Sequence, residues 1–182
     1  QGYASAITDP AVLDVIANTL TGSIAVTYVE WAANQATVVD WTIIDGPDSA
    51  TGFAEALLAP PRLAFGRNAI GAALLEGKRL IETNQITGLR RVIDFSGDSA
   101  NNYGGPPIRT ARDQVVAAGI TINGLPILCS ACGGSGVNLE QAYADQIIGG
   151  PGAFVVTADG RDSFSAAVRR KLNLEIAGLT PD

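Results

Sequence analysis

The stretch RVIDFSGDSANN, residues Arg91–Asn102, decides how the chain is interpreted. A β-branched run ends there, and Asp94, Ser96 and Asp98 follow at alternate positions before a turn rich in Gly and Asn. In α/β proteins ligands bind beyond the carboxyl ends of the strands, and oxygen donors suit the hard cations Mg²⁺ and Ca²⁺. The alternative is that Asp94, Ser96 and Asn101 only cap the loop and the following helix.

The rest of the chain alternates strand and helix patterns around this stretch. Two β-rich runs, 23–31 and 36–44, predict a hairpin whose second strand lies at a sheet edge. Helices are expected from Asp9-Pro10, from Ser49 and over 69–84, and strands at 90–96, 120–127 and 153–158 then alternate with helices. This order predicts one α/β domain over 1–182, with a mostly parallel sheet covered by helices on both faces and one antiparallel edge strand.

Composition restricts the function. The formal net charge is −6 and no basic run is present, which argues against nucleic acid and acidic membrane surfaces and favours a cation or a basic protein face. No apolar run approaches the length of a bilayer span. The absence of His removes the commonest general base, the usual Ser and Cys triads and the commonest zinc ligand. There is no Met, so we expect the native start upstream of Gln1.

A series of motifs carries a family resemblance. They are YVEWA (28–32), FGRNAIGAAL (65–74), RRVIDFSGDSANN (90–102), GITINGLPI (119–127) and IGGPGAFVVTADGRDSFSAAVRRKLNLEIA (148–177). The chain resembles a bacterial family of secreted proteins of unknown function with a von Willebrand factor type A-like domain. The resemblance implies a three-layer, Rossmann-like sheet and, in many relatives of the wider superfamily, a metal-ion-dependent adhesion site.

The resemblance also assigns the metal-site residues. Asp98 matches the third element of such a site, Asn68 stands where the second element has Thr, and Ser96 is expected close by. The first element, Asp-x-Ser-x-Ser, and the central strand before it have no counterpart in 1–182. We therefore expect an incomplete site that binds Mg²⁺ or Ca²⁺ weakly or not at all. The implied strand order is 36–44, 23–31, a place for the missing first strand, 90–96, 120–127 and 153–158.

Cys129 and Cys132, in CSAC, follow a predicted strand. In a secreted chain we expect them to form a small structural disulfide. The alternative is a thioredoxin-like redox pair, although GGSGVN separates the motif from its helix. Two Cys cannot close a tetrahedral zinc site without further ligands.

Three more expectations concern single segments. Glu30 and Trp31 are interpreted as structural residues, and Asn138 as a helix N-cap with Gln141 completing a capping box. Residues 169–171, Arg-Arg-Lys, are expected on a solvated helix face.

These observations predict a non-enzymatic protein-binding or assembly module of a secreted or periplasmic protein, with a divalent cation as an optional aid. The partner is another protein or a subunit of an assembly. The alternatives are a thiol–disulfide oxidoreductase that uses Cys129 and Cys132, and a purely structural subunit of a larger complex.

Overall fold

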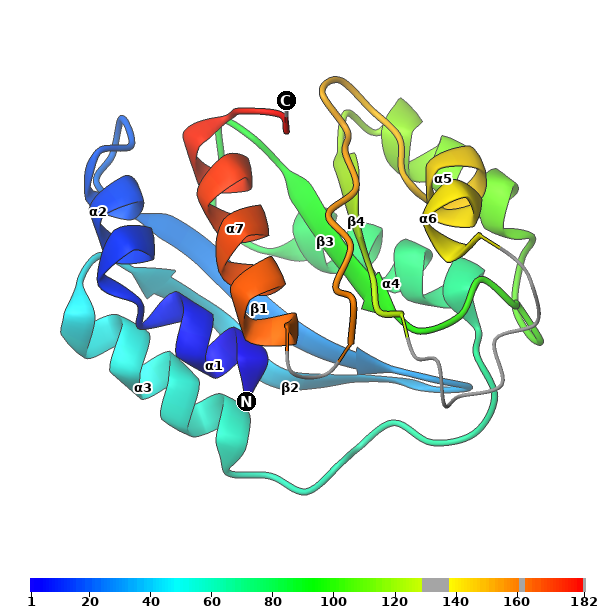
Figure 1. Ribbon diagram of the computed structural model, residues 1–182, viewed down its shortest axis with the longest axis horizontal. Helices are drawn as coiled ribbons and strands as arrows, with labels where there is room; N and C mark the ends of the chain where they lie inside the picture. Colours follow the sequence, from blue (N-terminus) through cyan, green and yellow to red (C-terminus); the bar gives the residue numbers. More distant parts are fainter. Residues whose placement is uncertain (129–137, 161–162, 182) are drawn as a thin grey trace.

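The computed structural model describes residues 1–128, 138–160 and 163–181, and Figure 1 shows the arrangement of its elements. The strands are β1 (Ile24–Trp31), β2 (Gln35–Ile44), β3 (Val92–Gly97) and β4 (Thr121–Pro126). The helices are α1 (Gly2–Ile7), α2 (Pro10–Ala17), α3 (Pro47–Leu58), α4 (Ile70–Thr83), α5 (Ile108–Ala117), α6 (Leu139–Ala142), the π-helix η1 (Tyr143–Ile147) and α7 (Phe164–Ala177).

Local sequence accounts for several helix ends. The Asp9 carboxylate accepts a hydrogen bond from the Ala11 N–H, and Pro10 occupies the first helical position of α2. The Asn138 side chain accepts from the Gln141 N–H, which confirms the predicted N-cap. At the other end of α7, Gly178 adopts a left-handed conformation with φ 73°, which favours Gly.

The described strands form two sheets. β1 and β2 form an antiparallel hairpin, and β3 pairs in parallel with β4, in the register Val92 with Thr121 to Gly97 with Pro126. The sequence predicted five strands in one sheet with a vacant place between 23–31 and 90–96; the described residues instead form two two-stranded sheets, and residues 153–158 form isolated bridges and not a strand. The predicted discontinuity between β1 and β3 is present.

The predicted strand 153–158 lies alongside β4 but joins it only through isolated parallel bridges at Val155 and Ala158. One reason is local. The Phe154 N–H donates to the side-chain oxygen of Asn123, at 3.1 Å, so a side chain takes the place of a backbone partner there.

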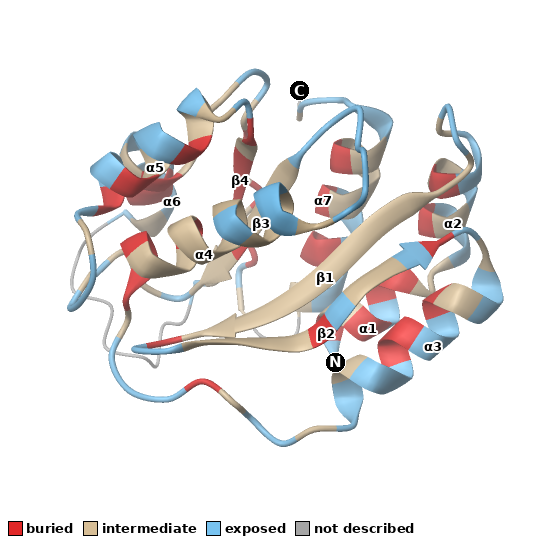
Figure 2. Cartoon of the chain, turned by 180° about the vertical axis from the view of Figure 1, so that it is seen from behind, coloured by how far each residue is buried: buried red, intermediate tan, exposed pale blue. Residues whose placement is uncertain are grey.

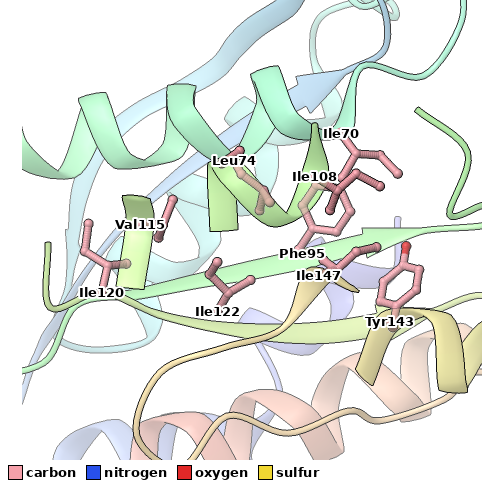
Figure 3. Packing of buried hydrophobic residues seen from close by; sticks show 10 residues of the cluster. Ile70, Leu74, Phe95, Ile108, Val115, Ile120, Ile122, Tyr143 and Ile147 are labelled. Atoms are coloured by element: carbon pink, nitrogen blue, oxygen red, sulfur yellow. The ribbon is translucent and has the colours of Figure 1, made fainter. Parts of the chain in front are cut away.

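Helices cover both faces of the strands (Figure 1). On one face, α4, α5 and η1 pack against β3 and β4 around a buried cluster shown in Figure 3, which includes Leu74, Phe95, Val115, Ile122 and Tyr143. On the other face, α1, α2 and α3 pack against β2, and α7 packs against β4 and the 153–158 segment. The described helices therefore form two layers with the strands between them, which is the arrangement of an α/β architecture.

Candidate functional site

The structure brings the three predicted site residues to one cavity. Asn68 lies just before α4, Ser96 lies near the end of β3, and Asp98 follows β3. All three line an open cavity of about 1380 Å³ between β1 and β3. Asn68 and Ser96 are half-buried, and Asp98 is exposed. Ser96 and Asp98 therefore lie at the carboxyl end of β3, and Asn68 lines the same cavity from the loop before α4.

Loop 62–68 is held by the end of β1. The Glu30 carboxylate accepts hydrogen bonds from the backbone N–H groups of Leu63, at 2.6 Å, and Ala64, at 3.2 Å. The Asn34 side chain accepts from the Phe65 N–H at 2.9 Å. Glu30 thus fixes a loop, in agreement with its interpretation as a structural residue.

Loop 98–107 docks on the same region. The Tyr103 N–H donates to the Asn68 carbonyl oxygen at 2.7 Å, and the Asn102 side chain accepts from the Gly71 N–H at 3.3 Å. Asn102 also donates to the Pro106 carbonyl oxygen. Loops 62–68 and 98–107 are therefore in direct contact, and Asp98 is the first residue of the second loop.

Exposed aromatic side chains project from both loops. Phe65 is 62% exposed and Tyr103 is 60% exposed. The Arg67 guanidinium carbon lies 5.0 Å from the centre of the Tyr103 ring, and that of Arg62 lies 5.9 Å from the centre of the Phe65 ring. We call Arg62, Phe65, Arg67 and Tyr103 the aromatic–arginine surface. Sequence reasoning missed it, and its only signal was two aromatic residues in loops rich in Gly, Pro and Asn.

A buried cluster of charged side chains, Lys171, Asp94 and Glu175, lies on the side of β3 that faces α7. Lys171 is 0% exposed, and its ammonium nitrogen lies 2.7 Å from Asp94 Oδ1 and 2.5 Å from Glu175 Oε1. The Tyr3 hydroxyl donates to Asp94 Oδ1, and the Asn123 amide donates to Glu175 Oε1. The expectation that residues 169–171 form a solvated face is therefore wrong for Lys171, because the carboxylates of β3 and α7 pair its charge. Asp94 is a member of this cluster rather than a loop cap.

Burial dominates the proton affinities of the cluster. Burial first and the neighbouring Asp94 charge second raise the pKa of Glu175 to about 7, against the opposing effects of Lys171 and Asn123. The pKa of the Tyr3 hydroxyl is raised above its usual value by burial and then by Asp94. With one fully buried cation between two carboxyl groups, the cluster is suited to holding α1, β3 and α7 together.

The chain matches the family described as "Protein of unknown function (DUF1194)" over residues 1–180. It is a member of the DUF1194 family. No curated protein matches this DUF1194 chain.

Three solved structures resemble the fold of the DUF1194 chain. Proximal thread matrix protein 1 from the mussel byssus gives a TM-score of 0.62 at 13% identity, over 97% of this chain and 43% of that one. The pilus adhesin SpaC from Lactobacillus rhamnosus GG gives 0.66 at 13% identity, over 98% of this chain and 28% of that one. An aerotolerance-related membrane protein from Bacteroides fragilis gives 0.53 at 18% identity, over 94% of this chain and 87% of that one.

These likenesses establish the fold alone. The DUF1194 chain spans less than half the length of the thread matrix protein and of the pilus adhesin. Among the residues that the structure describes, no helix combines the length and the apolar character needed to cross a bilayer.

The donor set of the DUF1194 chain does not fit a divalent cation by itself. Asn68, Ser96 and Asp98 offer one carboxylate, whereas Ca²⁺ takes six or more oxygens and Mg²⁺ requires an octahedron. Over 1–128, 138–160 and 163–181 no group of three or more His, Cys, Asp or Glu side chains could hold a metal ion. Cys129 and Cys132 lie outside the described residues, so their disulfide and the redox alternative stay predictions.

Proposed function

We propose that this DUF1194 member is a non-enzymatic protein-binding module of a secreted or periplasmic protein, and that it engages its partner through loops 62–68 and 98–107. The observation that carries the proposal is the aromatic–arginine surface. Binding hot spots are enriched in Tyr and Arg, and a large exposed aromatic side chain loses little conformational entropy when it is covered.

Charge supports a protein partner. Arg62 and Arg67 lie on this surface although the chain as a whole carries a net charge of −6. The local excess of arginine suits a partner surface that offers carboxylates around an apolar pocket. The mussel thread matrix protein and the pilus adhesin share the fold, and their names suggest assembly and adhesion for those proteins.

A divalent cation is at most an aid in this proposal. Asp98 lines the same cavity as Arg62, and a cation shared there with a carboxylate of the partner would complete a coordination shell that Asn68, Ser96 and Asp98 leave short. Binding that is retained in a chelator would show that the partner is held by the side chains alone.

The test is partner capture with matched variants. Protein carrying a photo-crosslinker within loop 98–107 is incubated with extract of the source cells, and crosslinked proteins are quantified by mass spectrometry. We expect Phe65→Ala with Tyr103→Ala to reduce capture of a specific partner at least about tenfold, since a hot-spot residue contributes about 2 kcal/mol or more. The control is Leu20→Ala, which alters an apolar side chain that is 87% exposed in the turn between α2 and β1. Equal capture by both variants, or turnover of a small substrate by the purified chain, would contradict the proposal.

A further inference from the structure

The buried cluster of charged side chains also contains an amide, the side chain of Asn123. Asn123 lies within β4, and its side-chain nitrogen donates to Glu175 Oε1 at 2.8 Å. The same oxygen lies 2.5 Å from the ammonium nitrogen of Lys171. An amine nitrogen and an amide nitrogen are therefore neighbours around one carboxylate oxygen.

These three side chains are withdrawn from water. Over 1–128, 138–160 and 163–181, the buried residues with charged or amide side chains are Lys171, Glu175 and Asn123, and all three belong to this one cluster. Figure 2 shows much of β4 and part of α7 in red, the colour of buried residues. The ring of Phe154 lies against the cluster, with its centre 5.9 Å from Lys171 Nζ. Reactive groups in such a site meet each other rather than solvent.

Lysine is an unusual choice for a wholly buried cation. Arg is better suited to buried ion pairs, because its planar guanidinium matches a carboxylate, whereas a buried Lys loses its proton more readily and then acts as a nucleophile. The sequence has ten Arg and only two Lys, Lys78 and Lys171. The residue at 171 therefore departs from the usual cation of this chain and suits a reactive amine.

The amide of Asn123 is held in one orientation. Its oxygen accepts from the Phe154 backbone N–H at 3.1 Å, and its nitrogen donates to Glu175. A fixed donor at a carbonyl oxygen stabilises the negative charge that develops there when the carbonyl carbon is attacked. The oxygen of Asn123 thus faces a donor for that charge, and its nitrogen faces an acid–base group.

We propose that Lys171 and Asn123 join spontaneously in an intramolecular isopeptide bond, with Glu175 as the group that transfers the protons. A bond forms between Lys171 Nζ and Asn123 Cγ, and the bond between Asn123 Cγ and Nδ2 breaks. Ammonia is the leaving group, and no oxidant, reductant or cofactor is consumed. The crosslink fastens α7 to β4, and it does not depend on the partner surface proposed above.

The proton balance closes within the cluster. Glu175 takes one proton from the Lys171 ammonium, and the free amine adds to Cγ of Asn123 while the carbonyl electron pair moves to Oδ1. Glu175 then gives its proton to Nδ2, and ammonia leaves with the electron pair of the broken C–N bond. The new amide nitrogen passes its surplus proton back to Glu175. The products are a neutral amide, ammonia and a protonated Glu175, and burial favours that protonated form because it raises the pKa of Glu175 to about 7.

Asp94 is the rival acceptor for the amine. Its Oδ1 lies 2.7 Å from Lys171 Nζ, and an amide formed with it would release water instead of ammonia. A carboxylate is the poorer electrophile, because its negative charge repels an attacking electron pair, whereas the amide of Asn123 is neutral. Asp94, which also accepts from the Tyr3 hydroxyl, instead positions the amine.

The test is peptide mapping by mass spectrometry of the folded chain after prolonged incubation at neutral pH. We expect one crosslinked pair of peptides, containing Asn123 and Lys171, that is lighter than the separate peptides by one ammonia molecule. Mapping is needed because cyclisation of Gln1 also releases ammonia but joins no peptides. Amine labelling in denaturant should then modify Lys78 and spare Lys171. Equal labelling of the two lysines would overturn the proposal, and so would a crosslink lighter by one water molecule, which would assign the acceptor to a carboxylate.

Matched variants test the chemistry, with circular dichroism to compare their folding. Asn123→Asp should yield a crosslinked peptide of the same mass as wild type, because the product is identical and only the leaving group changes to water. Glu175→Gln should slow crosslinking at least about a hundredfold in samples taken at intervals after cell-free synthesis, the lower end of what a positioned acid–base group supplies. Lys78→Met is the control and should crosslink at the wild-type rate. Folded Glu175→Gln that crosslinks as fast as wild type would overturn the proposal, and the wild-type map decides it without any variant.

Discussion

Lys171 of α7 and Asp94 of β3 form an ion pair with 2.7 Å between Nζ and Oδ1, and the lysine side chain is wholly buried. Removing one partner of a buried pair leaves the other charge without compensation. Lys171→Met should therefore lower the free energy of unfolding by about 3–5 kcal/mol, measured by urea denaturation. Arg170→Met, at an exposed neighbouring position, should change it by less than about 0.5 kcal/mol.

A combined variant separates charge from shape in this cluster. Apolar residues of similar volume often replace a buried ion cluster at little cost. Lys171→Met together with Asp94→Leu and Glu175→Leu should recover most of the stability that Lys171→Met loses. If the triple variant were less stable than the single one, specific hydrogen bonding rather than charge burial would dominate the cluster.

Glu175 should make stability depend on pH. Its folded pKa of about 7 exceeds the ordinary value of 4.5, so the folded state holds the proton more tightly than the unfolded state. The contribution is fully present below about pH 4.5 and is lost as the pH rises through about 7. The stability of the wild type relative to Glu175→Gln should therefore fall between pH 4.5 and 7, in urea titrations at several pH values. Glu55→Gln, on the exposed face of α3, is the control for a Glu-to-Gln substitution away from the buried cluster.

Two glycines should respond oppositely to substitution by alanine. A Cβ at Gly97 would lie 2.9 Å from Trp31 Cζ2 and 2.9 Å from the Tyr143 hydroxyl oxygen, so Gly97→Ala should destabilise by about 1–3 kcal/mol. Gly52 lies within α3 with nothing within 4 Å of such a Cβ, and Gly52→Ala should stabilise by about 0.5–1 kcal/mol. Thermal unfolding of both variants distinguishes crowding from helix propensity.

Glu30 should control the order of loop 62–68. Glu30→Ala removes the acceptor of the Leu63 and Ala64 N–H groups, and both amides should then exchange faster in hydrogen-exchange experiments. The exchange of amides in α5 should stay unchanged. Unaltered exchange at Leu63 and Ala64 would mean that Asn34 alone holds the loop.

The 182-residue chain should bind divalent cations weakly. Isothermal titration with Mg²⁺ and with Ca²⁺ should give dissociation constants no tighter than about 10⁻⁴–10⁻³ M, since Asn68, Ser96 and Asp98 supply few oxygens. Sub-micromolar binding that survives Asp98→Ala would rule out this placement of the site.

Sequence pattern predicted the larger features of the fold well. The hairpin of β1 and β2, the caps of α2 and α6 and the parallel pair of β3 and β4 follow from local periodicity and capping residues, which act over a few positions. The strand-end rule placed Ser96 and Asp98 at the carboxyl end of β3, whereas the grouping of Asn68 with them was implied by the family resemblance.

The features that sequence missed depend on contacts between distant segments. Lys171 looked like one of three exposed cations, and only the approach of β3 brings Asp94 to it. Likewise, nothing in loop 62–68 indicates that Arg67 would lie over the ring of Tyr103. Such pairs are set by tertiary packing, which overrides local pattern.

The contact of Trp31 with both halves of the strand layer gives the chain an optical reporter. Its ring stacks on Phe95 with 4.8 Å between centroids, and its N–H donates to the Ser96 carbonyl oxygen across the cavity between β1 and β3. The sequence has only one other tryptophan, Trp41 of β2, so Trp41→Phe leaves a single indole at the carboxyl ends of β1 and β3. Its fluorescence emission would shift to longer wavelengths if the two sheets separated and water reached the ring. Separation of the two sheets can therefore be followed in solution, in real time, without an attached label.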